Sequence, residues 1–178
     1  MGFAGSVLRW SRSVCGWPHG SKSSSQRCHA PACRLGFAKT GRKYADALNL
    51  PLAFVEKRRL GNDLRREALT LIGDVEGKDC IIVDDLVDTA GSITQAVQVV
   101  KDNGANDVDI VFTHPVLSDP ALERFKATDI REIITTDTIP MREDHGLDNL
   151  KVLSTAELLG EVIMRSHEGR SVGELFDE

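Results

Sequence analysis

Long apolar runs are missing from this chain of 178 residues, and no stretch approaches the ~20 consecutive apolar residues that a membrane-spanning helix requires. The sequence therefore excludes such a helix. Internal repeats are also absent, and a chain that is 41% hydrophobic and 28% charged has the composition of a globular protein, not of a disordered or collagen-like one. The length suits one ordinary domain with a short extension.

Acidic residues are missing from residues 1–34, which hold seven serines and five basic residues. Residues 35–178 carry the other 17 basic residues and all 27 acidic ones, and their net charge of −10 argues against a broad nucleic-acid-binding face. Because the basic leader shows no helical or strand period, we expect residues 1–34 to be unstructured and the folded domain to span 35–178. The leader has the composition of an organellar transit peptide, but the abrupt change at Leu35 favours a translated junction such as a misassigned start.

Cysteine is scarce after the leader, where Cys80 stands alone. It lies in an apolar run, so we expect a buried, inert thiol in a reducing compartment and therefore a cytoplasmic protein. The cysteines and histidines of the leader match no familiar zinc-site spacing, and scattered thiols are the preferred interpretation. They are Cys15, His19, Cys28, His29 and Cys33.

Short apolar runs alternate with amphipathic, helix-forming stretches along residues 35–178. The run Cys80–Val83, with three β-branched residues, predicts a strand covered on both faces in a parallel sheet. The same pattern predicts strands at 52–55, 68–75, 108–112, 130–134 and 152–153, and helices at 40–50, 92–103, 120–126 and 155–167. Strands separated by helices are typical of a doubly wound, mostly parallel α/β sheet. The charged stretch 57–66 is expected to be a mobile loop or a hairpin.

The segment Val83–Ser92 reads Val-Asp-Asp-Leu-Val-Asp-Thr-Ala-Gly-Ser. A buried strand ends in Asp84 and Asp85, and a short loop then opens a helix, which is the geometry of a ligand site at the carboxyl end of a parallel strand. Loop amides and a helix N-terminus favour an anion. Carboxylates suit sugar hydroxyls, or a metal ion carried by a phosphorylated ligand. Together these groups indicate a phosphosugar site. The alternative is a purely structural helix start, with Asp88 or Thr89 as the N-cap.

This segment resembles the phosphoribosyl-diphosphate (PRPP) binding motif of type I phosphoribosyltransferase folds. Four further segments narrow the resemblance to the ribose-phosphate diphosphokinases, the PRPP synthetases, and the ending 158–176 is also similar to that family. The resemblance runs from about Gly36 to the C-terminus. The four segments are Phe54–Arg59, Ile72–Lys78, Thr113–Ser118 and Thr136–Pro140.

The resemblance implies transfer of the diphosphoryl group of ATP to the C1 hydroxyl of ribose 5-phosphate, with Mg²⁺ as the cofactor. It implies that Asp84 and Asp85 hold the ribose hydroxyls and that Lys57, with Arg59 as its partner, is catalytic on a loop that closes over the site. It further implies ribose 5-phosphate or PRPP and ATP as ligands and a homo-oligomer, with no nucleic acid or membrane. The residues expected to cradle the 5-phosphate are Asp88, Thr89, Ala90, Gly91 and Ser92.

The resemblance breaks near the start of the chain. The other half of the family, with its nucleotide-binding loops and metal-binding histidine, has no counterpart, and Arg34 stands where the family has an aspartate beside the metal. We therefore expect a truncated family domain behind a foreign leader, with one sheet strand removed and with little or no PRPP synthesis by itself. Two alternatives stay open: a stand-alone phosphoribosyltransferase, although no acceptor-binding hood is evident, and a non-catalytic, synthetase-associated regulatory subunit. His114 is assigned no role.

Overall fold

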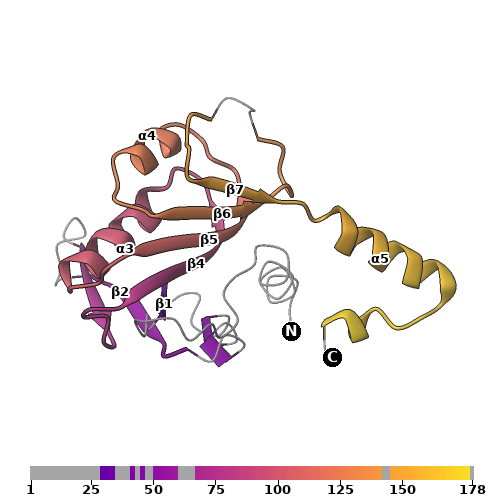
Figure 1. The fold of residues 1–178 in the computed structure, drawn as a ribbon, viewed down its shortest axis with the longest axis horizontal. Coiled ribbons are helices and arrows are strands. Elements are labelled where there is room, and N and C mark those ends of the chain that lie inside the picture. Colours follow the sequence, from indigo (N-terminus) through magenta and orange to yellow (C-terminus); the bar gives the residue numbers. More distant parts are fainter. Residues whose placement is uncertain are drawn as a thin grey trace, which may run out of the picture.

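The computed structural model describes residues 29–34, 41–42, 45–46, 50–59, 67–141 and 145–176. Over these residues the sheet has seven strands in the order β3-β2-β1-β4-β5-β6-β7 (Figure 1). The strands are β1 (His29–Arg34), β2 (Ala53–Arg59), β3 (Glu67–Ile72), β4 (Asp79–Val87), β5 (Val108–Pro115), β6 (Glu132–Thr136) and β7 (Leu150–Leu153). The helices are α3 (Gly91–Asp102), α4 (Ala121–Lys126) and α5 (Ala156–Glu168), followed by the 3₁₀ turn η2 (Gly173–Phe176).

The sheet is parallel except at one edge, where β2 and β3 run antiparallel. The chain moves outward from β1 to β3 on one side, then returns to β4 beside β1 and moves outward to β7 on the other. The strand order therefore reverses between β1 and β4. In doubly wound sheets, ligands bind outside the carboxyl ends of the strands at such a switch point. The predicted doubly wound, mostly parallel fold is confirmed.

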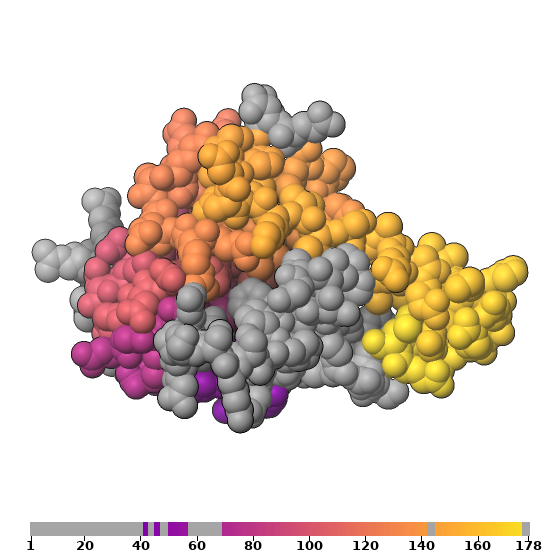
Figure 2. All heavy atoms as spheres, viewed as in Figure 1, coloured from indigo at the N-terminus to yellow at the C-terminus, as the bar shows by residue number. Residues whose placement is uncertain are grey.

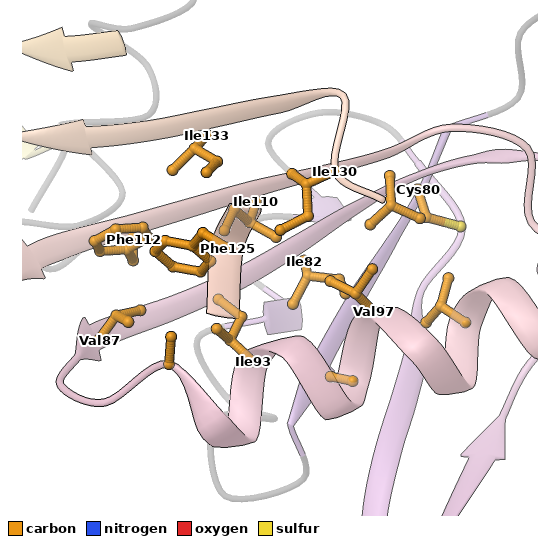
Figure 3. Close-up of a cluster of buried hydrophobic side chains, with 14 of the residues drawn as sticks. Cys80, Ile82, Val87, Ile93, Val97, Ile110, Phe112, Phe125, Ile130 and Ile133 are labelled. Carbon is orange, nitrogen blue, oxygen red and sulfur yellow. The ribbon is translucent and has the colours of Figure 1, made fainter. Parts of the chain in front are cut away.

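The main hydrophobic core lies between one face of the sheet and the helices α3 and α4 (Figure 3). Ile93 and Val97 of α3 lie one helical turn apart and cluster with Ile82 of β4. Phe125 of α4 stacks on Phe112 of β5 with ring centroids 6.3 Å apart. Burying one such side chain contributes about 1.5–3 kcal/mol, so this layer fixes both helices against the central strands.

The opposite face of the central strands is buried as well. Ile81 and Val83 alternate with the core-facing residues of β4 and are at most 2% exposed, and Ile134 of β6 is 3% exposed. Adjacent residues of a strand point to opposite sides, so β4 is covered on both faces. This confirms the prediction made from the continuous apolar run Cys80–Val83.

Residues 29–34 differ from the sequence prediction, which placed them in the unstructured leader and left the sheet without this strand. They form β1, in which Cys33 lies opposite Phe54 of β2 and Val83 of β4. The sequence signal was weak because Pro31 lacks an N–H and is rarely found in a central strand. The sheet thus begins before the predicted boundary at residue 35. The rest of the predicted leader, residues 1–28, lies outside the described residues.

The charged stretch 57–66 was predicted to be a loop or a hairpin. Residues 57–59 continue β2, and Lys57 lies opposite Leu69 of β3, so the strands on either side of residues 60–66 pair antiparallel, as in the predicted hairpin. Residues 60–66 lie outside the described residues. Of the predicted helix at 40–50, the described residues 41–42 and 45–46 are helical, whereas Leu50 is not.

Helix α5 extends away from the sheet beyond β7 (Figure 1) and forms a yellow lobe in Figure 2. None of its residues is buried, and Ile163 is 69% exposed. Gly169 ends the helix in the left-handed conformation, with φ 68°. Thr155 occupies the N-cap position, but its hydroxyl donates to Asp137 Oδ1 at 2.8 Å instead of capping the helix. Among the described helices, none is long and apolar enough to cross a bilayer.

Candidate functional site

Strand β4 is longer than predicted, because its pairing with β5 continues to Val87, opposite Pro115. The acidic pair therefore lies inside the strand and not after it. Neighbouring strand residues point to opposite faces, and the two carboxylates differ accordingly. Asp84 is 6% exposed, and its Oδ1 accepts a hydrogen bond from the Asp85 amide at 3.1 Å. Asp85 is exposed to solvent.

The loop after β4 is held by two buried apolar residues. Val87 and Ala90 are 3% and 4% exposed and belong to the main core, while Asp88 and Thr89 between them are exposed. Figure 3 shows Val87 beside Phe112. Ala90 has φ 60°, a left-handed conformation that costs about 1–2 kcal/mol for a residue with a Cβ. The core thus fixes a strained turn whose exposed tip is Asp88–Thr89.

Helix α3 begins directly after this turn, without a side-chain cap. Its N-cap is Ala90, and no side-chain cap hydrogen bond is formed, so the interpretation with Asp88 or Thr89 as the N-cap is wrong. The first turn, which includes Gly91 and Ser92, also contains no acidic residue. The amides of this turn therefore lack a side-chain acceptor, and the positive end of the helix favours an anion there.

Hydrogen bonds to the backbone carbonyls of the loop hold it in place. Arg124 Nη1 of α4 donates to the Thr89 carbonyl at 2.7 Å, and the Leu117 amide donates to the Val87 carbonyl at 3.0 Å. Thr94 donates to the Ala90 carbonyl from both its amide, at 3.1 Å, and its hydroxyl, at 2.9 Å. Arg124 was not predicted from the sequence, because a basic residue in a short surface helix gives no signal of a contact 35 positions away.

The predicted catalytic pair lies at the same edge of the sheet as this loop. Cys33 of β1 is level with both Phe54 of β2 and Val83 of β4. From this level β2 continues to Arg59 and β4 to Val87, and both run parallel to β1. Two strand spacings, about 10 Å, separate β2 from β4. The side chains of Lys57 and Arg59 lie outside the described part of the chain.

The carboxyl ends of β5 and β6 carry a hydrogen-bonded cluster. His114 Nδ1 lies 2.9 Å from Thr138 Oγ1, which donates to the Thr113 carbonyl at 3.0 Å. Burial opposes ionisation of Asp137, but hydrogen bonds from Ser154 and from the amide and hydroxyl of Thr155 outweigh it and hold the pKa of the Asp137 carboxyl below its ordinary value. These contacts tie the end of β6 to the start of α5 and leave His114 in a packed position.

At the amino ends of the central strands, one arginine pairs with three aspartates. Arg131 precedes β6 and makes a bidentate contact with Asp109 of β5, with Nε–Oδ1 at 2.8 Å and Nη2–Oδ2 at 2.5 Å. Its Nη1 reaches Asp79 of β4 at 3.1 Å and Asp107 at 2.9 Å. The hydrogen bonds that Arg131 donates to the Asp109 carboxylate raise the pKa of the guanidinium above its ordinary value. This contact ties together the amino ends of three strands.

Among the described residues, no group of three or more His, Cys, Asp or Glu side chains is arranged so that it could hold a metal ion. The carboxylates of β4 instead suit a Mg²⁺ ion that keeps several waters and is bound by one or two carboxylates together with ligand phosphates. The thiol of Cys80 is buried, as predicted, and it is not part of a disulfide. The predicted leader residues Cys15, His19 and Cys28 lie outside the described part of the chain.

Comparison with known proteins places this geometry in a family. A family model, the phosphoribosyl synthetase-associated domain, matches residues 61–177. Ribose-phosphate pyrophosphokinase (a synonym of ribose-phosphate diphosphokinase) from Caldanaerobacter subterraneus is 47% identical over 141 residues, which cover 79% of this chain and 44% of that protein. The chain belongs to the ribose-phosphate pyrophosphokinase family. The Listeria ivanovii member is 43% identical over 142 residues, covering 80% of this chain and 44% of that protein. The chain thus spans less than half the length of these ribose-phosphate pyrophosphokinases.

Solved structures agree with this membership of the ribose-phosphate pyrophosphokinase family. The phosphoribosylpyrophosphate synthetase of Mycobacterium smegmatis superposes with a TM-score of 0.78 at 35% identity, over 93% of this chain and 51% of that chain. The adenine phosphoribosyltransferase of Thermoanaerobacter pseudethanolicus superposes with a TM-score of 0.51 at 21% identity, over 75% of this chain and 77% of that chain. At that identity the likeness shows a shared fold alone.

Proposed function

We propose that the chain binds ribose 5-phosphate or PRPP at the segment Asp84–Ser92. One observation carries the proposal: at the switch point of the sheet, α3 begins without a side-chain cap three residues after β4, whose carboxyl-terminal half carries Asp84 and Asp85. Free amides and a helix dipole suit a phosphate, and carboxylates accept hydrogen bonds from sugar hydroxyls. Membership of the ribose-phosphate pyrophosphokinase family supports the same ligand.

Each part of the segment has its own contact with the ligand in this proposal. Residues 88–92 cradle the 5-phosphate through their amides and through the hydroxyls of Thr89 and Ser92. Asp85, which is exposed, accepts from the ribose hydroxyls. Asp84, which is buried, shapes the end of the strand and contributes charge beside the sugar. One or both of these carboxylates, together with the ligand phosphates, would hold Mg²⁺, which would neutralise charge that develops on a transferred group.

We further propose that the domain takes part in diphosphoryl transfer from ATP to ribose 5-phosphate. It would do so together with the part of the ribose-phosphate pyrophosphokinase relatives that this chain does not cover. Such a transfer depends mainly on positioning and on cations beside the developing charge. Lys57 and Arg59 would supply those cations, because β2 ends at the same edge of the sheet as the phosphosugar segment. A homo-oligomer and a cytoplasmic location stay predictions.

Titration calorimetry of the chain with ribose 5-phosphate tests the binding site. The variant Asp85→Asn, in which an amide replaces the exposed carboxylate, should bind ribose 5-phosphate about tenfold more weakly. The reason is that a hydrogen bond to a charged group contributes about 1.5–3 kcal/mol. The double variant Asp84→Ala/Asp85→Ala should weaken it further. The control is Asp102→Ala/Asp148→Ala, which removes two exposed carboxylates elsewhere and should leave the affinity unchanged. An equal affinity for all variants would defeat the assignment.

Lys57→Ala tests the catalytic role in a chimaera that carries the amino-terminal portion of a relative ahead of Gly36. We expect kcat to fall far more than the affinity for ribose 5-phosphate, because the ammonium group is proposed to act mainly in the transition state. Steady-state kinetics with both substrates provide the measurement. If only KM rises, Lys57 helps to bind the substrate and does not act in the transfer.

A further inference from the structure

We propose that Arg124 is a positioning residue for the phosphate loop, defined here as residues 88–92. In this proposal, Arg124 aims the amide of Ala90 at the ligand by holding the carbonyl of Thr89. The inference rests on the proposed phosphosugar site and adds to it a residue from a different element, α4, which follows the next strand along the sheet.

The inference rests on a short hydrogen bond from a side chain whose helix is anchored in the core. Arg124 Nη1 donates to the Thr89 carbonyl at 2.7 Å. Helix α4 itself is anchored in the core, because Ala121 is fully buried and Phe125 is 3% exposed and stacks on Phe112. A guanidinium that projects from an anchored helix can hold the loop in one place.

Holding a carbonyl also sets the direction of an amide. The peptide unit is planar and trans, so its N–H points opposite to its C=O. The carbonyl of Thr89 shares a peptide unit with the amide of Ala90, and Arg124 therefore fixes where that N–H points. In the next peptide unit, Thr94 holds the Ala90 carbonyl and thereby fixes the amide of Gly91. Two successive amides are aimed in this way, as in a backbone anion-binding nest.

The strain in the loop explains why such contacts are needed. Ala90 is left-handed, with φ 60°, and a strained residue persists only where its surroundings determine its conformation. Gly91 leaves room for the guanidinium, because a Cβ at this position would lie 3.0 Å from Arg124 Nη1. The contact between Arg124 and Thr89 thus belongs to the construction of the turn.

Binding measurements with three variants of the full chain test the proposal. Arg124→Met, which keeps an apolar stem but no donor, is expected to weaken ribose 5-phosphate binding by about tenfold in calorimetry, the effect of one charge-assisted hydrogen bond. Arg124→Lys, which keeps a donor and the charge, should restore most of the affinity. Lys126→Met removes the same charge from the same helix and should leave the affinity unchanged. Thermal unfolding should show the same midpoint for all variants, so that lost affinity is not lost folding.

Backbone ¹⁵N relaxation of the ligand-free protein supplies the second measurement. Arg124→Met should lower the order parameters of the Ala90 and Gly91 amides from values typical of rigid backbone, ~0.85, and Lys126→Met should not. Unchanged order parameters would overturn the proposal, since a cation that contacted only the phosphate would leave the free loop as it is. Lower order parameters with unchanged affinity, or no rescue by lysine, would also overturn it. If the wild-type chain fails to bind ribose 5-phosphate, the proposed function fails, and the order parameters alone decide whether Arg124 holds the loop.

Discussion

Replacing Arg131 by methionine is expected to lower the free energy of unfolding by about 3 kcal/mol, near the lower end of the range for breaking a buried ion pair. The reason lies in its partners. The side chains of Asp109 and Asp79 are 2% and 5% exposed, and the variant leaves both carboxylates without the guanidinium. The Arg131 side chain is itself 32% exposed, so water reduces the loss. A domain of ordinary stability, about 5–15 kcal/mol, would lose a large share of it.

Urea unfolding followed by circular dichroism measures this loss. The matched control is Arg170→Met, which removes an exposed arginine that pairs with Glu168 at 2.6 Å. Exposed pairs contribute about 0–1 kcal/mol, so the control should unfold near the wild-type midpoint. Equal losses in the two variants would show that the contact between Arg131 and its three aspartates does not hold the amino ends of β4, β5 and β6 together.

The chain by itself is expected to release AMP from ATP and ribose 5-phosphate at a rate far below the ~1–10³ s⁻¹ of typical enzymes. Transfer requires the β-phosphorus of ATP to be held in line with the C1 hydroxyl, and orientation of this kind supplies about 7–11 kcal/mol of the barrier reduction. The sequence offers one phosphosugar segment and one cationic strand end, but no recognisable nucleotide-binding loop. The chain covers 44% of its ribose-phosphate pyrophosphokinase relative from Caldanaerobacter subterraneus.

The assay uses ATP, Mg²⁺ and ribose 5-phosphate, with AMP separated and quantified. A chimaera that carries the amino-terminal portion of the Caldanaerobacter relative is the positive control and should restore turnover. Rapid turnover by the chain alone would contradict the account and would place a nucleotide site among residues interpreted here as scaffold. Strong binding of ribose 5-phosphate without turnover in either protein would favour the non-catalytic, regulatory interpretation.

Much of the fold could be predicted from local patterns. The apolar run Cys80–Val83 predicted a doubly covered central strand, because such a run suits a parallel sheet. The spacing of Ile93 and Val97 predicted α3, and these residues do face the core. The order of strand, acidic pair, small-residue loop and helix is contiguous in the sequence and is present in the structure. That a phosphosugar binds there stays a prediction.

The rest depends on contacts between distant parts of the chain. Strand β1 was missed because Pro31 is atypical of a central strand, although parallel pairing with β2 and β4 accommodates it. The alternative with Asp88 or Thr89 as the N-cap rested on side-chain preference, whereas in the structure the N-cap is the buried Ala90. Arg124 could not be found, because its partner Thr89 lies 35 positions away and only the packing of α4 brings them together.

The central claim is that a phosphosugar binds where β4 ends and α3 begins, and mapping of backbone amide chemical shifts tests it most directly. Ribose 5-phosphate is titrated into ¹⁵N-labelled full-length chain, with ribose alone and inorganic phosphate alone as matched ligands. The account predicts that ribose 5-phosphate causes the largest shifts at the amides of residues 85 and 88–92, and that inorganic phosphate affects residues 88–92 more than residue 85. Shifts concentrated elsewhere, such as along α5 or at the edge of the sheet around Arg131, would contradict it, as would the absence of any shift at millimolar ligand.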